Sequence, residues 1–209
     1  MPDLTELLAP ETTAVVTVEM QRGVIGDRVS DNALRRAVRD QRVIPAAVRL
    51  VAAARAAGVR VVHATVALRA DRAGLTINNR MMAMVLKGPD QVLEGTPEAE
   101  LIPELGPEAT DIVVGRIHGL TPFTGTELDS ILRNLGVRTI VPAGVSVNEA
   151  LLGACLSAAD LGYRIVLPVD AVAGVPEEYA AAVVRHTLAL ITNPATVDQI
   201  VTAWKPEIE

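Results

Sequence analysis

The chain contains five short runs of continuous apolar, largely β-branched residues, and these runs constrain its fold more than any other feature. Gly, Pro or Asp stands at or near the ends of most runs, and longer segments with helical spacing lie between them. Because the apolar residues do not alternate with polar ones, both faces of each strand are expected to be covered. The runs predict strands over residues 14–18, 60–66, 111–114, 139–143 and 164–168.

The segments between these runs carry the residues expected at the ends of crossover helices. Pro45 and Pro176 stand near helix starts, and Gly58, Gly136 and Gly162 stand just past helix ends. The alternation of strands and helices, with right-handed crossovers, predicts an α/β fold, a three-layer α/β/α doubly wound type with a mostly parallel sheet. The predicted helices cover residues 43–57, 126–135, 147–161 and 177–191.

The length and the apolar pattern favour a single α/β domain over residues 1–209. Half of the residues are hydrophobic, but no apolar stretch approaches the roughly eighteen residues that a membrane span needs. Residues 1–10 contain Asp3 and Glu6 and lack the basic and apolar regions of a signal peptide. The sequence therefore predicts a cytoplasmic protein with no membrane partner.

The charge and the scarcity of aromatic residues argue against a nucleic-acid partner. A net charge of −6 repels phosphates, and aromatic residues make up only 2% of the chain. The single cysteine, Cys155, cannot form an internal disulfide, and three histidines offer no clustered metal-ligand set. We therefore expect neither a metal nor a cofactor. The many Ala and Val residues suggest apolar surface that is buried in a homo-oligomer, a dimer or a tetramer.

Residues 67–110 form the least regular part of the sequence. They contain four prolines and one segment with helical spacing, residues 79–86. A long irregular stretch inside a compact domain is often a lid or the wall of a pocket. A surface insertion without a function is the alternative.

Polar residues follow the predicted strands directly, where an open parallel sheet binds its ligands. Glu19 comes just after the first strand, and a carboxylate among apolar residues is a candidate general acid or base. A purely structural ion pair with a nearby arginine is the alternative. Arg116 and His118 follow the third strand. An arginine binds anions but cannot accept a proton. A histidine titrates near neutrality, and the alternative for His118 is a residue at the rim of the site without a chemical role.

The turn after the fourth strand leads into a helix whose first N–H groups could bind an anion or oxyanion. Ser146 and Asn148 in this turn are expected to act as helix caps. No strand end has the glycine pattern of a dinucleotide or triphosphate site, which argues against a dehydrogenase.

Several blocks of this sequence resemble the isochorismatase-like hydrolases, also called the cysteine hydrolase superfamily. They occur in the order and spacing of that family and extend over nearly the whole chain. The blocks are Phe123-Thr124-Gly125-Thr126-Glu127-Leu128 with Leu132 and Leu135-Gly136-Val137, Gly144-Val145-Ser146-Val147-Asn148, Gly162-Tyr163, and Asp170-Ala171-Val172-Ala173.

The resemblance implies an aspartate, a lysine and a cysteine as catalytic residues, and this chain has none of them in place. Glu19 stands at the position of the aspartate, and Arg116 is the cation nearest to that of the lysine, one residue off the usual spacing. The position of the cysteine falls on Ala150. Cys155 lies five residues further along the helix, about 7.5 Å on and rotated by about 140°, so it is expected to face elsewhere. His63 stands alone where metal-binding members of the family have their ligands.

Two functions remain open from the sequence. The first is a hydrolase without a thiol, in which Glu19 is the general acid and Arg116 holds an anionic small molecule, as the vinyl-ether-cleaving members of the family suggest. The second is an inactive family member that serves as a small-molecule binding or assembly protein. In the first, the residues expected to surround the substrate are Gln21, Arg69, His118, Phe123, Val147 and Ala150.

Overall fold

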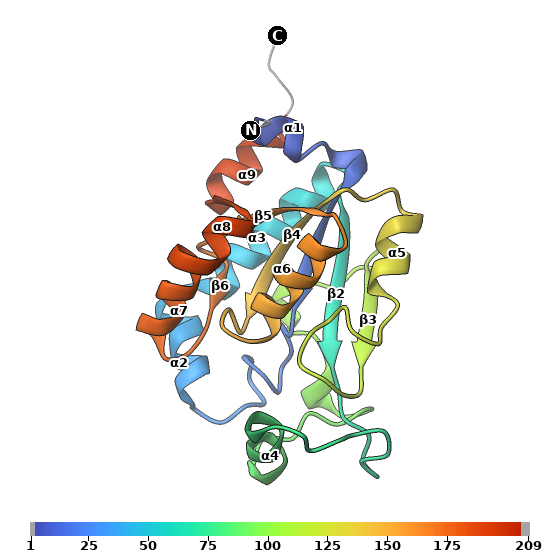
Figure 1. Ribbon diagram of the computed structural model, residues 1–209, viewed down its shortest axis with the longest axis vertical. Helices are drawn as coiled ribbons and strands as arrows, with labels where there is room; N and C mark the ends of the chain where they lie inside the picture. The colour runs from blue at the N-terminus through green and yellow to red at the C-terminus, as the bar shows by residue number, and fades with distance from the viewer. Residues whose placement is uncertain (1–2, 206–209) are drawn as a thin grey trace.

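The protein, described over residues 3–205 by a computed structural model, is built on a seven-stranded sheet (Figure 1). The strand order is β3-β2-β1-β4-β5-β7, β6 pairs with β4 beside this path, and all the pairings between these strands are parallel. The strands are β1 (Thr13–Val18), β2 (Arg60–Val66), β3 (Ile112–Arg116), β4 (Thr139–Val145), β5 (Arg164–Pro168), β6 (Val172–Ala173) and β7 (Asn193–Ala195).

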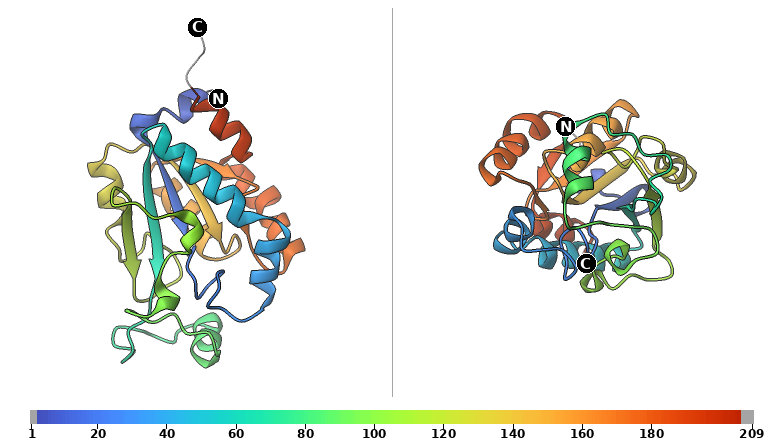
Figure 2. Two further views of the ribbon diagram at one scale, coloured as in Figure 1. Left: turned by 180° about the vertical axis from the view of Figure 1, so that it is seen from behind. Right: turned by 90° about the horizontal axis from the view of Figure 1, so that it is seen from below.

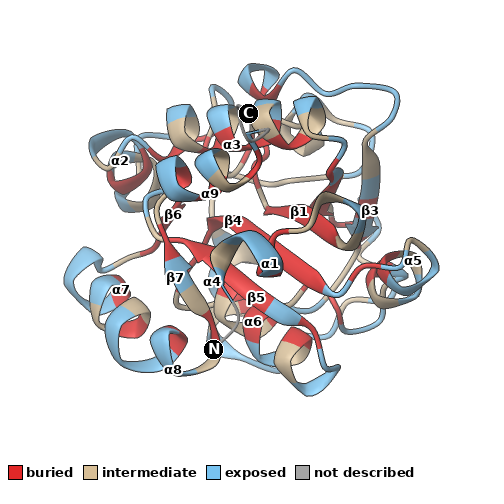
Figure 3. Cartoon of the chain, turned by 90° about the horizontal axis from the view of Figure 1, so that it is seen from above, coloured by how far each residue is buried: buried red, intermediate tan, exposed pale blue. Residues whose placement is uncertain are grey.

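Helices cover both faces of the sheet, as the apolar runs require. On one face α3 (Val43–Ala56) packs against β1, β2 and β4 and contacts α9 (Val197–Ala203), with α2 (Ala33–Asp40) beside it (Figure 2). The other face carries α5 (Leu128–Asn134), α6 (Ala150–Asp160) and α7 (Glu177–Val183). Seen from above, the buried strands lie between helices whose outer sides are exposed (Figure 3).

The remaining elements are short. α1 (Leu4–Leu7) contacts α9, and α7 continues through a π-helical turn (Val184–Leu188) into α8 (Ala189–Ile191). Three 3-10 turns cover Pro10–Thr12, Pro97–Ala99 and Pro103–Leu105. No helix within residues 3–205 has the length and hydropathy needed to cross a membrane.

The predicted three-layer parallel fold is confirmed, with corrections at the element ends. Each of the five predicted strands is present, although β3 begins one residue later and extends to Arg116, and β4 extends to Val145. The helix predicted from residue 147 begins only at Ala150, because a turn occupies the residues before it. The sequence did not predict α1, α2, α9, β6 or β7, which have between two and eight residues each.

The irregular region contains α4 (Arg80–Lys87), close to its predicted range. The side chain of Asn79 caps this helix by accepting a hydrogen bond from the N–H of Met82 at 2.8 Å. The flanking segments meet where Leu68 pairs with Leu93. In the view from below, α4 lies across the end of the molecule at which the strands finish (Figure 2). This position makes α4 a wall of the space beyond the sheet.

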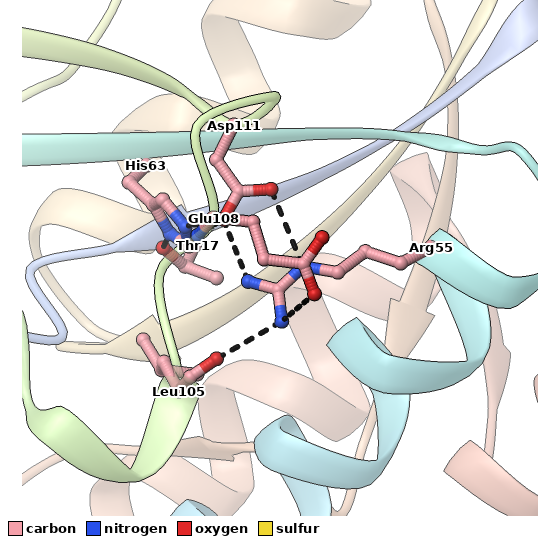
Figure 4. A network of polar contacts seen from close by, with 6 residues as sticks. All are labelled: Thr17, Arg55, His63, Leu105, Glu108 and Asp111. Carbon is pink, nitrogen blue, oxygen red and sulfur yellow. Dashed lines mark hydrogen bonds and ion pairs between the residues drawn. The ribbon is translucent and has the colours of Figure 1, made fainter.

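A polar network is buried between the sheet and α3 (Figure 4). The ring of His63 contacts the hydroxyl of Thr17 through Nδ1 at 2.7 Å and Asp111 through Nε2 at 3.2 Å. Arg55 donates to Asp111 at 2.6 Å and to the carbonyl oxygen of Leu105 at 3.1 Å. Burial lowers the pKa of His63, and the Asp111 carboxylate opposes this only in part. A neutral ring that donates to Asp111 and accepts from Thr17 satisfies both contacts.

Asp111 is the residue on which this network depends. Burial acts to raise the pKa of Asp111, but hydrogen bonds from Arg55, the Glu108 N–H and His63 outweigh it and lower the pKa below its usual value. The carboxylate side chain is only 3% exposed. An ionised Asp111 therefore ties α3 and the start of β3 to the centre of the sheet.

We predict that Asp111→Asn destabilises the protein by about 3 kcal/mol, because the largely buried guanidinium of Arg55 loses its buried counter-charge and keeps only the exposed Glu108, at 3.6 Å. Chemical denaturation of the full chain measures this loss. Asp40→Asn is the matched control, since Asp40 forms an exposed pair with Arg39 and its loss is expected to change stability little. Equal stabilities for the two variants would contradict the assignment of Asp111.

Candidate active site

A cavity of about 230 Å³ lies at the carboxyl end of the sheet, between the strand ends and α4. Its walls are mostly apolar and include three side chains of α4. A small apolar cavity with a few polar groups on one side is the usual form of a small-molecule site. The polar residues that line it are Glu19, Asn32, Asp90, Arg116, Ser146 and Glu149.

Glu19 enters the cavity from the residue directly after β1. Its N–H still donates to the carbonyl oxygen of Ala64 on β2, at 2.9 Å, and its φ of 54° then turns the chain out of the sheet. A positive φ is uncommon for a residue with a side chain, and such residues occur preferentially at functional sites. The turn places a carboxylate that is 16% exposed at the cavity.

Arg116 is the last residue of β3 and reaches Glu19 across the end of β2. β2 pairs with both flanking strands, which brings the ends of β1 and β3 to the same edge. Nη2 of Arg116 forms an ion pair with Oε1 of Glu19 and donates to the carbonyl oxygen of Leu120 at 3.2 Å. The two predicted residues are therefore in direct contact.

The guanidinium of Arg116 is not fully satisfied by these contacts. Its side chain is 3% exposed, and both Nε and Nη1 are buried without a hydrogen-bond partner among the described residues. A buried donor without an acceptor costs about 1–3 kcal/mol. A ligand or water that supplies an acceptor would remove this cost, so the arginine is suited to bind an electron-rich group.

Glu149 is a third charged residue of the cavity, and it stands in the turn before α6. The N–H groups of Glu149 and Leu151 both donate to the carbonyl oxygen of Ser146 at 3.0 Å, which fixes the turn. Burial raises the pKa of Glu149 above its usual value, and the negative charge of Glu19 raises it further. Its carboxylate has no ion-pair partner within residues 3–205.

The sequence pattern did not predict a role for Glu149. The predicted helix began at residue 147, which would place Glu149 inside the first turn, whereas α6 begins at Ala150. The available signal was a carboxylate between the end of a central strand and a helix start. That position is the one from which parallel sheets present their functional groups.

Ala150 lines the cavity as the first residue of α6, and its side chain ends in a methyl group. Cys155 does not line the cavity; it is buried among apolar side chains between α6 and the sheet. Burial raises the pKa of its thiol to about 12. The thiol is thus protonated at neutral pH and lies outside the site.

Three other residues expected around the substrate are buried away from the cavity. The amide of Gln21 donates to the carbonyl oxygens of Val66 and Ala99 and accepts from the N–H of Val66, all within 2.9 Å. Phe123 packs in the core, with its ring 6.2 Å from that of Tyr163. Val147 is buried in the same core. None of these three side chains lines the cavity.

Two further residues expected around the substrate do not line the cavity. Arg69 pairs with Asp71 at 2.7 Å, and its side chain is largely exposed. The ring of His118 lies beside Gly125, in the loop after β3, and is not part of the cavity wall. Within residues 3–205, no three His, Cys, Asp or Glu side chains are grouped so as to hold a metal ion.

The chain belongs to the isochorismatase family of hydrolases, whose domain matches residues 13–199. It is 28% identical to the isochorismatase family protein YecD of Escherichia coli O157:H7, over 94% of this chain and 98% of that protein. The ureidoacrylate amidohydrolase RutB of Methylorubrum extorquens is 34% identical, over 51% of this chain and 47% of RutB, so that match spans about half of RutB.

A solved structure supports the same grouping. An isochorismatase family protein from Desulfovibrio vulgaris superimposes with a TM-score of 0.77 at 26% identity, covering 91% of this chain and 98% of that one. The likeness therefore extends over the sheet and both helical layers.

We predict that Glu149→Gln stabilises the protein at neutral and alkaline pH. A pKa that is raised in the folded state means that ionising the Glu149 carboxyl costs more free energy in the folded than in the unfolded protein. As the pH rises above the ordinary glutamate value of 4.5, the ionised glutamate therefore lowers the stability of the fold. Below that value the carboxyl is protonated in both states and the two proteins should be equally stable. Chemical denaturation at several pH values measures the difference.

The exposed Glu178 of α7 provides the matched control. Glu178→Gln should lack this pH-dependent gain. If Glu149→Gln were less stable than the wild type at alkaline pH, the charge of Glu149 would stabilise the folded protein. This result would contradict the raised pKa of Glu149.

Proposed function

We propose that this protein hydrolyses a small, anionic molecule without a cysteine nucleophile, with Glu19 as general acid/base and Arg116 as the anion-binding residue. The observation that carries the proposal is the contact between Glu19 and Arg116 inside a small, mostly apolar cavity at the strand ends. A carboxylate in such surroundings is suited to proton transfer.

The absence of a thiol from the cavity limits the mechanism. By the family resemblance the position of the nucleophilic cysteine falls on Ala150, whose methyl group cannot form a bond to the substrate. Cys155 is the only cysteine of the chain, and it is buried elsewhere with a raised pKa. We propose that water attacks the substrate and that Glu19 transfers protons between that water and the substrate.

Arg116 favours a substrate with a carboxylate or a similar anion. Among the described residues its Nε and Nη1 groups have no acceptor, so each can donate a hydrogen bond to an oxygen of an anionic group. The names of the family and of RutB suggest isochorismate and ureidoacrylate as the first compounds to test. Both are small carboxylates.

A binding protein without catalytic activity is the second candidate. The observation that favours it is the ion pair itself, because Arg116 already occupies the carboxylate of Glu19 and Ala150 offers no reactive atom. In this case the cavity would hold its ligand unchanged.

A thermal-shift screen followed by kinetics tests the proposal. Isochorismate, ureidoacrylate and small neutral amides are each added to the full chain, and a compound that binds the folded state raises Tm with its occupancy. We expect a carboxylate to bind and to be hydrolysed. Binding without turnover would favour the second candidate.

For the compound that is hydrolysed, Glu19→Gln should lower kcat by at least about 100-fold, because a positioned proton-transfer group contributes a factor of that size. The amide keeps the shape of the side chain, so the thermal shift with the same compound should persist. Glu178→Gln is the control and should keep the wild-type rate. Full activity of Glu19→Gln would rule out Glu19 as the general acid/base.

A further inference from the structure

Glu149 lines the same cavity as Glu19. It follows β4, which lies on the side of β1 opposite to β2 and β3. Glu19 follows β1, whereas Glu149 ends the turn that joins β4 to α6, and β4 pairs with β1 along its whole length. The raised pKa of Glu149 includes a contribution from the charge of Glu19, so the two carboxylates act on each other. The cavity therefore contains a carboxylate pair.

The two carboxylates differ in their partners. Glu19 has the guanidinium of Arg116 as its counter-charge. Within residues 3–205 Glu149 forms no ion pair, and its side chain makes no capping hydrogen bond to α6. The remaining acidic residue of the cavity, Asp90, accepts hydrogen bonds from the N–H and hydroxyl of Ser30. Of the acidic groups that line the cavity, Glu149 is the one without a donor.

We propose that Glu149 is a second catalytic residue, which donates the proton to the leaving group while Glu19 accepts the proton from water. The proposal rests on the proposed function and assigns direction to its proton transfers. Two carboxylates whose surroundings favour opposite protonation states are the usual arrangement for an acid and a base in one site. Here Arg116 forms an ion pair with Glu19 and not with Glu149.

The step balances in protons and charge. The water oxygen forms a bond to the electrophilic carbon of the substrate, and one water proton passes to the carboxylate of Glu19. The bond from that carbon to the leaving atom breaks with its electrons on the leaving atom, which takes the proton of Glu149. Glu149 is then ionised and Glu19 protonated, and transfer of one proton from Glu19 to Glu149 through solvent restores the starting state.

Helix α6 opposes this assignment, since its N-terminus favours a negative charge at Glu149. The side chain of Glu149 does not accept a hydrogen bond from the first N–H groups of the helix, so the strongest form of that stabilisation is missing. Burial and the charge of Glu19 both act in the other direction. The charged groups that line the cavity around Glu149 are Glu19, Asp90 and Arg116.

The first test uses the carboxylate that proves to be a substrate in the screen above. Glu149→Gln should lower kcat by at least about 100-fold with little change in KM, as expected for loss of a general acid. In the wild type, kcat should fall as rising pH removes the proton of Glu149, and this alkaline decline should be absent from the residual activity of the variant. Glu149→Asp, which restores a carboxyl group, should recover part of the rate and the decline.

The second test needs no substrate. ¹³C NMR follows the titration of the Glu149 carboxyl in the full chain, assigned by its loss in Glu149→Gln. Its midpoint should lie above the ordinary glutamate value of 4.5 and should fall in Glu19→Gln, because the neighbouring charge is removed. A midpoint at the ordinary glutamate value of 4.5, unmoved by Glu19→Gln, would overturn the proposal even if the protein is a hydrolase.

The outcomes separate this inference from the proposed function. Full activity of Glu149→Gln together with an inactive Glu19→Gln would overturn the role of Glu149 and leave Glu19 as general acid/base. Full activity of Glu19→Gln would contradict the proposed function, on which the inference depends. Loss of activity in both variants, with an unchanged thermal shift, is the result we expect.

Discussion

The central strand β1 is the constraint on which the rest of the structure depends. All six of its residues are buried, and it pairs with β2 on one side and β4 on the other. Gly144 permits this close pairing, because its φ is 119° and a Cβ there would collide with the carbonyl oxygen of Val18. A charge along such a buried strand would be costly, so the carboxylate of Glu19 stands directly after the strand end.

The electrostatics of the cavity follow from that geometry. The ends of β1, β3 and β4 bring Glu19, Arg116 and Glu149 to one apolar space, where charges act on each other more strongly than in water. One guanidinium cannot neutralise both carboxylates, and its contact is with Glu19. The carboxyl left over is the one whose pKa is raised. Residues that lower the stability of the folded protein in this way are common in active sites.

The sequence predicted the parts of the fold that depend on local pattern. Continuous apolar runs marked the five long strands, but β6 and β7, with two and three residues, carry too little pattern to be recognised. Glu19 and Arg116 were predicted from their positions at strand ends, and both line the cavity. Their contact depends on both strands flanking β2, which the sequence does not state. Gln21 was expected beside the substrate, but its amide turns inward to the backbone of Val66. Glu149 was not predicted, because the helix start was placed too early.

The central claim is that hydrolysis at this site needs no thiol. The chain has one cysteine, so Cys155→Ala removes every thiol while leaving Glu19, Arg116 and Glu149 in place. The decisive measurement is the rate at which the cysteine-free protein hydrolyses its carboxylate substrate, with thermal melting to confirm that it is folded. The account predicts the wild-type rate. A folded cysteine-free protein that has lost its activity would contradict it.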